Sequence, residues 1–288
     1  MSANSLSKKP LLPKLKVSKI AKSFSGARGW KWLFIFPAWV ALAYIFSNLL
    51  LVLGSIILGM FDRSYSDFAN PAVVNAVLSI VVYALSITIV VAVPYTLKTR
   101  YKTTVQELGL QRLIYWSDIG LAPVFFIGYV MASQIVLAVV TSVLPAFPLD
   151  QAQDVGFKAF GSTTDNIIAF ATLVVLAPIA EETLFRGYLY GKLRTYAPVV
   201  YLGKKAGRLH KWTSENSPAI LAAIATSVLF GLAHLQWNVG IDVFILSLFL
   251  CALRSITGSI WAGVLVHMIK NGLAFYIMFV APLTGLGG

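Results

Sequence analysis

Long stretches without a charged residue are the feature that most constrains this chain. Residues 32–61, 68–97, 119–149 and 216–241 contain no Asp, Glu, Lys or Arg. Each stretch is long enough for a membrane-spanning helix, which needs about 20 apolar residues. Charged residues make up only 12% of the chain, hydrophobic residues 58%, and the mean hydropathy is +0.79. This composition excludes a soluble enzyme and predicts an integral, multi-pass membrane protein.

The uncharged stretches and their flanking Pro, Gly and Asn residues predict an all-α fold, a polytopic membrane helical bundle of about seven (six to eight) transmembrane helices. The expected spans are 32–61, 73–97, 119–144, 166–187, 218–236, 240–254 and 256–281. We divide the chain into four segments. They are a basic tail (1–31), N-terminal transmembrane helices with their loops (32–164), a C-terminal transmembrane region (165–281) and a short C-terminal tail (282–288).

The net charge of +12 is distributed unevenly along the predicted topology. The first 31 residues hold eight basic residues and no acidic one, directly ahead of the first apolar stretch. With this tail inside, the segments 98–118 and 188–217 are also inside, and together with Arg186 and Arg254 at inner helix ends they place 20 of the 23 basic residues on the same side. The positive-inside rule explains this pattern, so the charge indicates a lipid bilayer and not nucleic acid as the partner. We expect the N-terminus in the cytoplasm and the chain in a bacterial plasma membrane.

Two adjacent carboxylates lie in an otherwise apolar span, in the sequence Ala-Pro-Ile-Ala-Glu181-Glu182-Thr-Leu-Phe-Arg186. An ionisable group at the centre of a membrane helix costs about 3 kcal/mol, so it is a functional-site hypothesis by default. Glu182 and Arg186 are four residues apart and can form an ion pair. Glu181 points about 100° away and is free to act on water as a general base. The alternative is a structural ion pair with Glu181 as an interfacial charge.

Two of the three histidines also lie in apolar spans, and each has a partner one helical turn away. Phe230 precedes His234 by four residues and can pack over its ring, and Asn271 follows His267 by four residues. The second pair offers either two metal ligands or two hydrogen-bond donors aimed at one oxygen. A single histidine in a membrane more often makes a helix–helix hydrogen bond. Together with Glu181 on another span, these residues favour a functional site.

Several other chemistries find no support in the residues. The chain has no His-Glu-x-x-His helix and no Gly-x-Ser-x-Gly turn, and Asp242 has no second aspartate to form a protease pair. Asp242 and Arg254 bracket a short span and are interpreted as markers of its two ends. Lys270 either counters Glu181 or Glu182 or pairs with a backbone carbonyl. The one cysteine, Cys251, excludes an internal disulfide and a Cys-based zinc cluster.

The remaining residues resemble the CPBP family (CAAX protease and bacteriocin-processing, Abi) of intramembrane endopeptidases, which includes the type II CAAX prenyl proteases. The three motifs are, in order, Glu181-Glu182-x-x-x-Arg186, Phe230-x-x-x-His234 and His267-x-x-x-Asn271. Each motif alone is weak, but the three in order on consecutive apolar segments are specific. They cover about 165–275, and the segment 106–112 is similar to one that often precedes them.

The resemblance implies an intramembrane endopeptidase that hydrolyses a peptide bond in a peptide or membrane-protein substrate. Glu181 would activate water, and His234, His267 and Asn271 would stabilise the oxyanion or hold a metal, supported by Glu182, Arg186 and Phe230. The substrate class stays open between a CAAX-type C-terminus and a secreted or bacteriocin-like peptide. The alternative is a non-proteolytic membrane scaffold or self-immunity protein with the same polar core. A proton-coupled carrier is a third hypothesis, weakened by the lack of an internal repeat.

Two questions about this site stay open in the sequence. The four residues could bind zinc with an open position, but an amide ligand is unusual and no second carboxylate is evident behind the histidines, so we favour metal-free catalysis over zinc. Counting from residue 219 also places His234 nearer the outer surface than Glu181. The two can meet only if the fifth span begins below the membrane surface, tilts, or is broken near Gly231.

Overall fold

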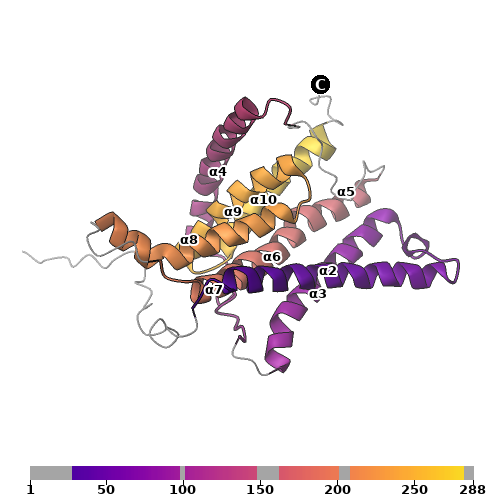
Figure 1. The fold of residues 1–288 in the computed structure, drawn as a ribbon. Helices are drawn as coiled ribbons and strands as arrows, with labels where there is room; N and C mark the ends of the chain where they lie inside the picture. Colours follow the sequence, from indigo (N-terminus) through magenta and orange to yellow (C-terminus); the bar gives the residue numbers. More distant parts are fainter. Residues whose placement is uncertain (1–27, 98–100, 148–161, 201–207, 282–288) are drawn as a thin grey trace, which may run out of the picture.

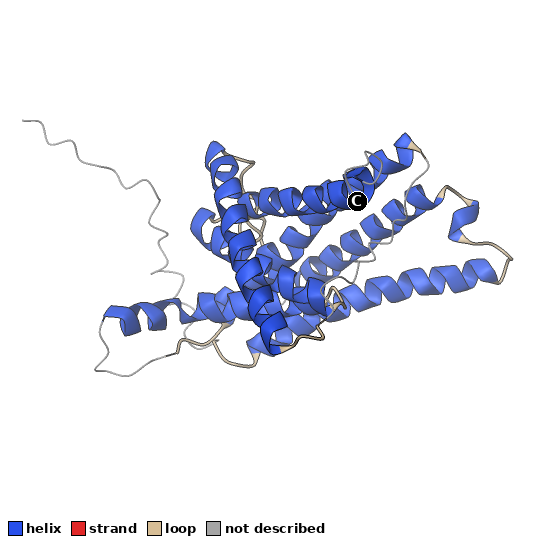
Figure 2. Cartoon of the chain, turned by 90° about the horizontal axis from the view of Figure 1, so that it is seen from above, coloured by secondary structure: helices blue, strands red, loops and turns tan. Residues whose placement is uncertain are grey.

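The chain forms a bundle of helices that confirms the predicted fold class. The computed structural model describes residues 28–97, 101–147, 162–200 and 208–281, and over these ranges it contains helices and loops but no strand (Figure 2). Within the same ranges, seven helical segments are long and apolar enough to cross a membrane. The protein is therefore an integral, multi-pass membrane protein. Most of the predicted basic tail (1–27) and the C-terminal tail (282–288) lie outside the described residues.

The first two helices form an antiparallel hairpin. Helix α2 spans Trp32–Gly59, and helix α3 spans Pro71–Thr96 after the short 3₁₀ turn η1 (Tyr65–Asp67). The start of α3 is set locally, since the Asn70 side chain accepts a 2.9 Å hydrogen bond from the Val73 amide. Proline at the first helical position fits because that residue needs no N–H partner there. The two helices are in contact and cross obliquely in Figure 1.

The fourth span is a continuous rod, Thr163–Tyr196, in which two π-helical segments interrupt the α-helix. It consists of α5 (Thr163–Phe170), η2 (Ala171–Leu176), α6 (Ala177–Glu182), η3 (Thr183–Leu189) and α7 (Tyr190–Tyr196). The segments η2 and η3 are π-helical, a conformation that is rare and frequently found at functional sites. The rod lies between the α2–α3 hairpin and the C-terminal helices (Figure 1).

The C-terminal part consists of α8 (Arg208–Leu232), α9 (Trp237–Thr257) and α10 (Trp261–Phe275), which continues as η4 (Tyr276–Val280). Helices α8 and α9 approach each other closely at two glycines. A Cβ atom on Gly231 would lie 2.8 Å from the carbonyl oxygen of Gly240, so only glycine fits without a shift. Helix α4 (Trp116–Val143) packs along α9 and α10.

The connection before α4 is pinned to the ends of the C-terminal helices. The carbonyl oxygen of Gly109, which has a φ of 77°, accepts a 2.9 Å hydrogen bond from the Ser259 hydroxyl. The Arg254 guanidinium donates to the carbonyl of Glu107 at 2.8 Å. This is the segment 106–112 that the sequence singled out as similar to one preceding the three motifs. It ties α9 and α10 together at the end predicted to face the cytoplasm.

Two predicted spans were wrong in their limits. The fourth continues past residue 187 to Tyr196, because the residues predicted to be a loop bury their side chains and extend the helix. Lys192 in this extension is only 5% exposed and donates to the Lys102 carbonyl at 2.6 Å. The fifth begins at Arg208 and not at 218, since Pro218 is accommodated inside α8. The other limits differ by no more than five residues, the largest difference being 256 predicted against Trp261 observed.

Candidate active site

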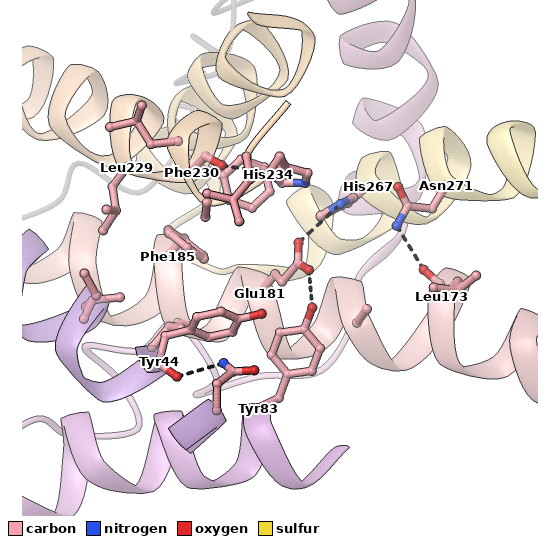
Figure 3. Close-up of a pocket in the computed structure, with 18 of the residues that line it drawn as sticks. Tyr44, Tyr83, Leu173, Glu181, Phe185, Leu229, Phe230, His234, His267 and Asn271 are labelled. Atoms are coloured by element: carbon pink, nitrogen blue, oxygen red, sulfur yellow. Dashed lines mark hydrogen bonds and ion pairs between the residues drawn. The ribbon is translucent and has the colours of Figure 1, made fainter. Parts of the chain in front are cut away.

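The four residues predicted to be catalytic line one internal cavity. Glu181, His234, His267 and Asn271 all face a space of about 820 Å³. Its walls come from α2, α3, the central rod, α8, the turn after α8, α10 and η4. Figure 3 shows the carboxylate of Glu181 opposite the ring of His267, with His234 on the far wall. The structure therefore brings together side chains from three segments that are distant in sequence.

A buried ion pair forms the floor beneath these residues. Arg186 and Glu182 are both 0% exposed, and Arg186 Nη1 donates to Glu182 Oε1 at 2.7 Å. The predicted pairing across one helical turn is thus present. The same oxygen also lies 3.1 Å from His267 Nδ1. Glu182 is therefore the second carboxylate that sequence reasoning did not find behind a histidine, and it fixes which nitrogen of His267 faces the cavity.

Phe230 joins the ion pair to both histidines. The Arg186 guanidinium lies 4.3 Å from the centre of the Phe230 ring, a cation–π distance. The edge contacts of this ring place its centre 5.0 Å from that of His234 and 5.9 Å from that of His267. Phe230 is 1% exposed. The predicted packing of Phe230 over His234 is observed, and the same ring also contacts His267 and Arg186.

Glu181 points away from its neighbour Glu182, as the helical geometry predicts, and its two oxygens have different surroundings. Oε1 accepts a hydrogen bond of 2.5 Å from the Tyr83 hydroxyl on α3. Oε2 lies 3.7 Å from His267 Nε2. The Glu181 side chain is 16% exposed, whereas that of Glu182 is fully buried. Glu182 is therefore a buried structural group, whereas Glu181 has an oxygen directed to the cavity.

His234 reaches the cavity because α8 ends just before it. The helix stops at Leu232, and a turn at residues 233–236 leads into α9. The early start of α8 and its end near Gly231 resolve the difference in depth expected from the sequence. His234 Nδ1 lies 2.9 Å from the Phe230 carbonyl, which can only accept, so Nδ1 carries the hydrogen. In the neutral ring, Nε2 is then an acceptor.

Asn271 lies on the same face of α10 as His267, but part of its hydrogen-bonding capacity is already used. Its Nδ2 donates to the carbonyl of Leu173 at 2.9 Å (Figure 3). Leu173 belongs to the π-helical segment η2, where the hydrogen-bond pattern departs from that of an α-helix. One amide hydrogen is therefore committed to the central rod, and the second hydrogen and the amide oxygen are left for other partners.

Two tyrosines at the cavity were missed by the sequence reasoning. Tyr44 on α2 and Tyr83 on α3 line the cavity together with Glu181. Both lie in stretches that carry none of the three motifs, where a tyrosine among apolar residues is typical of core packing or of lipid contact. No spacing rule links residue 83 to residue 181, so only the packing of α3 against α6 reveals the contact.

The donor set was also compared with what a metal ion requires. Among the described residues, no group of three or more His, Cys, Asp or Glu side chains is arranged so that it could hold a metal. The hydrogen bond that His267 Nδ1 donates to Glu182 resembles the carboxylate support that metal-binding histidines receive. The residues present thus offer a base, an imidazole held between two carboxylates, an acceptor imidazole and an amide.

The fold and the cavity define a class: helical membrane proteins in which Glu, His and Asn side chains meet at one site inside the bundle. Residues 163–273 match the family described as type II CAAX prenyl endopeptidase Rce1-like. The resemblance predicted from the three motifs is confirmed over this range, which contains all seven residues of the motifs.

A second comparison links part of the chain to a bacterial protein. The chain is 31% identical over 111 residues to an uncharacterized 24.3 kDa protein of Escherichia coli. The aligned part makes up 37% of this chain and 42% of that protein, so the match spans less than half of the relative's length. No solved structure matches the chain significantly.

Proposed function

We propose that this protein is an intramembrane endopeptidase in a bacterial plasma membrane and that Glu181 activates the attacking water. The observation that carries the proposal is the position of Glu181 Oε2, directed to a cavity inside an otherwise apolar bundle. A carboxylate at this depth costs several kcal/mol, so a cavity and a proton acceptor at the same place favour chemistry over packing. The similarity of residues 163–273 to endopeptidases supports the same reaction.

The reaction balances with the groups at hand. Glu181 Oε2 takes a proton from water while the water oxygen attacks the carbonyl carbon of the peptide bond. The C–O bond forms and the carbonyl oxygen becomes an oxyanion. Glu181 then delivers the proton to the peptide nitrogen, the C–N bond breaks, and a carboxylic acid and an amine leave. The low dielectric of the cavity strengthens each charge interaction in this sequence.

The two histidines have different parts in the proposal. Both nitrogens of His267 face carboxylate oxygens, Nδ1 at 3.1 Å from Glu182 and Nε2 at 3.7 Å from Glu181. Such a ring can stabilise an oxyanion, together with the second amide hydrogen of Asn271. His234 offers an acceptor at Nε2 and can orient the water or the substrate amide.

We further propose that the reaction runs without a metal. Glu181 Oε2 already lies 3.7 Å from His267 Nε2, and one amide hydrogen of Asn271 is already used by Leu173. A strong chelator is expected to leave cleavage unchanged after dialysis, and added zinc is expected to have no stimulating effect. Loss of cleavage with the chelator and its return with zinc would instead assign His234, His267 and Glu181 as ligands.

The substrate is proposed from the family description. A peptide with an isoprenoid-modified cysteine near its C-terminus is the first class to test, because the matched family is described as CAAX prenyl endopeptidases. An unmodified secreted or bacteriocin-like peptide is the second. Both classes have apolar groups that suit the aliphatic and aromatic side chains which α2 and η4 supply around the polar end of the cavity.

The test compares new protein termini by mass spectrometry in cells that express the natural chain, Glu181→Gln or Glu215→Gln at matched levels. Glu215 is an exposed residue on α8 outside the cavity, so Glu215→Gln is the control for loss of a carboxylate. We expect a set of termini that requires Glu181 and is unchanged in the control. Identical termini in all three strains, together with a phenotype on gene deletion, would replace the protease with a membrane scaffold.

A further inference from the structure

Tyr83 brings a helix without any motif into the site. It is the thirteenth of the 26 residues of α3, near the middle of the span. Its hydroxyl donates to Glu181 Oε1 at 2.5 Å, shorter than a usual hydrogen bond between neutral groups. A hydroxyl paired with a carboxylate makes such short bonds. The contact joins residues that are 98 positions apart in the sequence.

The hydrogen bond divides the work between the two oxygens of Glu181. Oε1 is occupied by the phenol, whereas Oε2 faces His267 Nε2 and the cavity. A glutamate side chain has three rotatable torsions, and without a partner it loses its orientation at little cost. The phenol therefore selects the rotamer in which Oε2 is available to take a proton from water.

The surroundings of Glu181 give this restraint a physical reason. The six-residue segment α6 that carries Glu181 lies between the π-helical segments η2 and η3. In these segments the helical repeat differs from 3.6 residues, so they change the face of the rod on which the residues that follow them lie. Helix α3 packs against α6 and supplies a fixed reference from outside the rod.

We propose that Tyr83 is a positioning residue for Glu181 and that α3 is thereby part of the catalytic apparatus. This inference rests on the proposed function, because its kinetic test needs peptide cleavage. Its spectroscopic test observes the Glu181 carboxylate directly and does not need cleavage. It predicts that loss of the phenolic hydroxyl impairs the chemical step while the substrate still binds.

The main variant is Tyr83→Phe, which keeps the ring and removes the donor. We expect kcat to fall about 10- to 100-fold, the effect of losing one hydrogen bond to a charged group, with KM within about twofold. Tyr65→Phe is the matched control, since the Tyr65 hydroxyl donates to the Leu51 carbonyl near the α2–α3 turn and outside the cavity. The control is expected to change neither constant.

The second measurement does not depend on catalysis. Infrared difference spectra between the natural chain and Glu181→Gln isolate the carboxylate band of residue 181. Tyr83→Phe is expected to shift this band, and Tyr65→Phe is not. If Tyr83→Phe does not fold, 3-fluorotyrosine at position 83 keeps the ring and makes the hydroxyl a stronger donor, so the band is expected to shift in the opposite direction.

The outcomes separate the two proposals. A chain that cleaves no peptide but shows the band shift overturns the protease and keeps the contact between Tyr83 and Glu181. An active chain whose band and kcat are both unchanged in Tyr83→Phe overturns the positioning role. A change in KM alone also overturns it, because Tyr83 would then contact the substrate and not set the base.

Discussion

Two acidic clusters among the described helices differ in what surrounds the carboxylate. At the first, Glu181 has one oxygen held by Tyr83 and the other directed to the cavity. At the second, Asp242 on α9 accepts from the Tyr129 hydroxyl at 2.7 Å and 2.8 Å and from the Ser133 hydroxyl at 2.6 Å. Asp242 does not line the cavity.

The comparison separates a carboxylate that fastens helices from one that is available for a reaction. Hydroxyl groups from α4 donate to both oxygens of Asp242, so it stabilises the contact between α4 and α9, and it does not line the cavity. The interpretation of Asp242 as a marker of a helix end was therefore incomplete. Lys270 lines the cavity and interacts electrostatically with both Asp242 and Glu181, so it lies between the two clusters in the sense that both carboxylates act on its charge.

The largest expected difference concerns cleavage. Glu181→Gln is expected to reduce the rate of peptide hydrolysis by about 10²- to 10⁴-fold, the usual contribution of a general base. Asp242→Asn, the matched change at the other cluster, is expected to stay within about threefold, because it alters no group at the reacting atoms. The measurement is the initial rate on a fluorogenic peptide in nanodiscs. Equal losses in both variants would remove the distinction between the clusters.

The next effect concerns stability. Glu182→Gln leaves Arg186 as an uncompensated charge that is 0% exposed, and we expect the free energy of unfolding to fall by about 3–5 kcal/mol. Cation–π contact with Phe230 offsets only part of this loss. Unfolding by a denaturing detergent in mixed micelles measures the change. Glu215→Gln on the exposed side of α8 is the control, and a loss below about 1 kcal/mol would show that Glu182 is not the anchor of the site.

A smaller loss is expected at the second cluster. Asp242→Asn keeps the shape of the side chain but turns charge-assisted hydrogen bonds into neutral ones, which costs about 1–3 kcal/mol of unfolding free energy. The same micelle titration gives the value, with Glu215→Gln on the exposed side of α8 as a control. The comparison breaks if Asp242→Asn destabilises the protein more than Glu182→Gln, since the fastening cluster would then be the main polar anchor.

The fold and the motif residues could be predicted because each depends on local sequence. Long uncharged stretches set the number of spans, and spacing along one helix set the pairing of Glu182 with Arg186. The gathering of Glu181, His234 and His267 followed from the resemblance to a family and is present in the structure. Their catalytic roles stay a prediction.

The parts that could not be predicted depend on contacts between distant helices. Tyr83 and Glu181 meet because α3 packs against the central rod, and no pattern in either segment encodes that distance. The hydrogen bond that His267 donates to Glu182 was missed for the same reason. The change of pitch in η2 and η3 has no recognised sequence rule here, although it determines where the Leu173 carbonyl meets Asn271.

The smallest expected effect concerns the hydrogen bond between Ser133 and Asp242. Ser133→Ala removes one of the two hydroxyl donors and leaves Tyr129 in contact with both carboxylate oxygens, so we expect a loss of about 0.5–1.5 kcal/mol in unfolding free energy and no change in cleavage rate. Ser142→Ala, at an exposed hydroxyl that bonds only within α4, is the matched control in the same titration. A cleavage rate that falls with Ser133→Ala would mean that Asp242 influences the site, and Lys270 is a cavity residue that interacts electrostatically with both Asp242 and Glu181. In that case the two clusters would function as one.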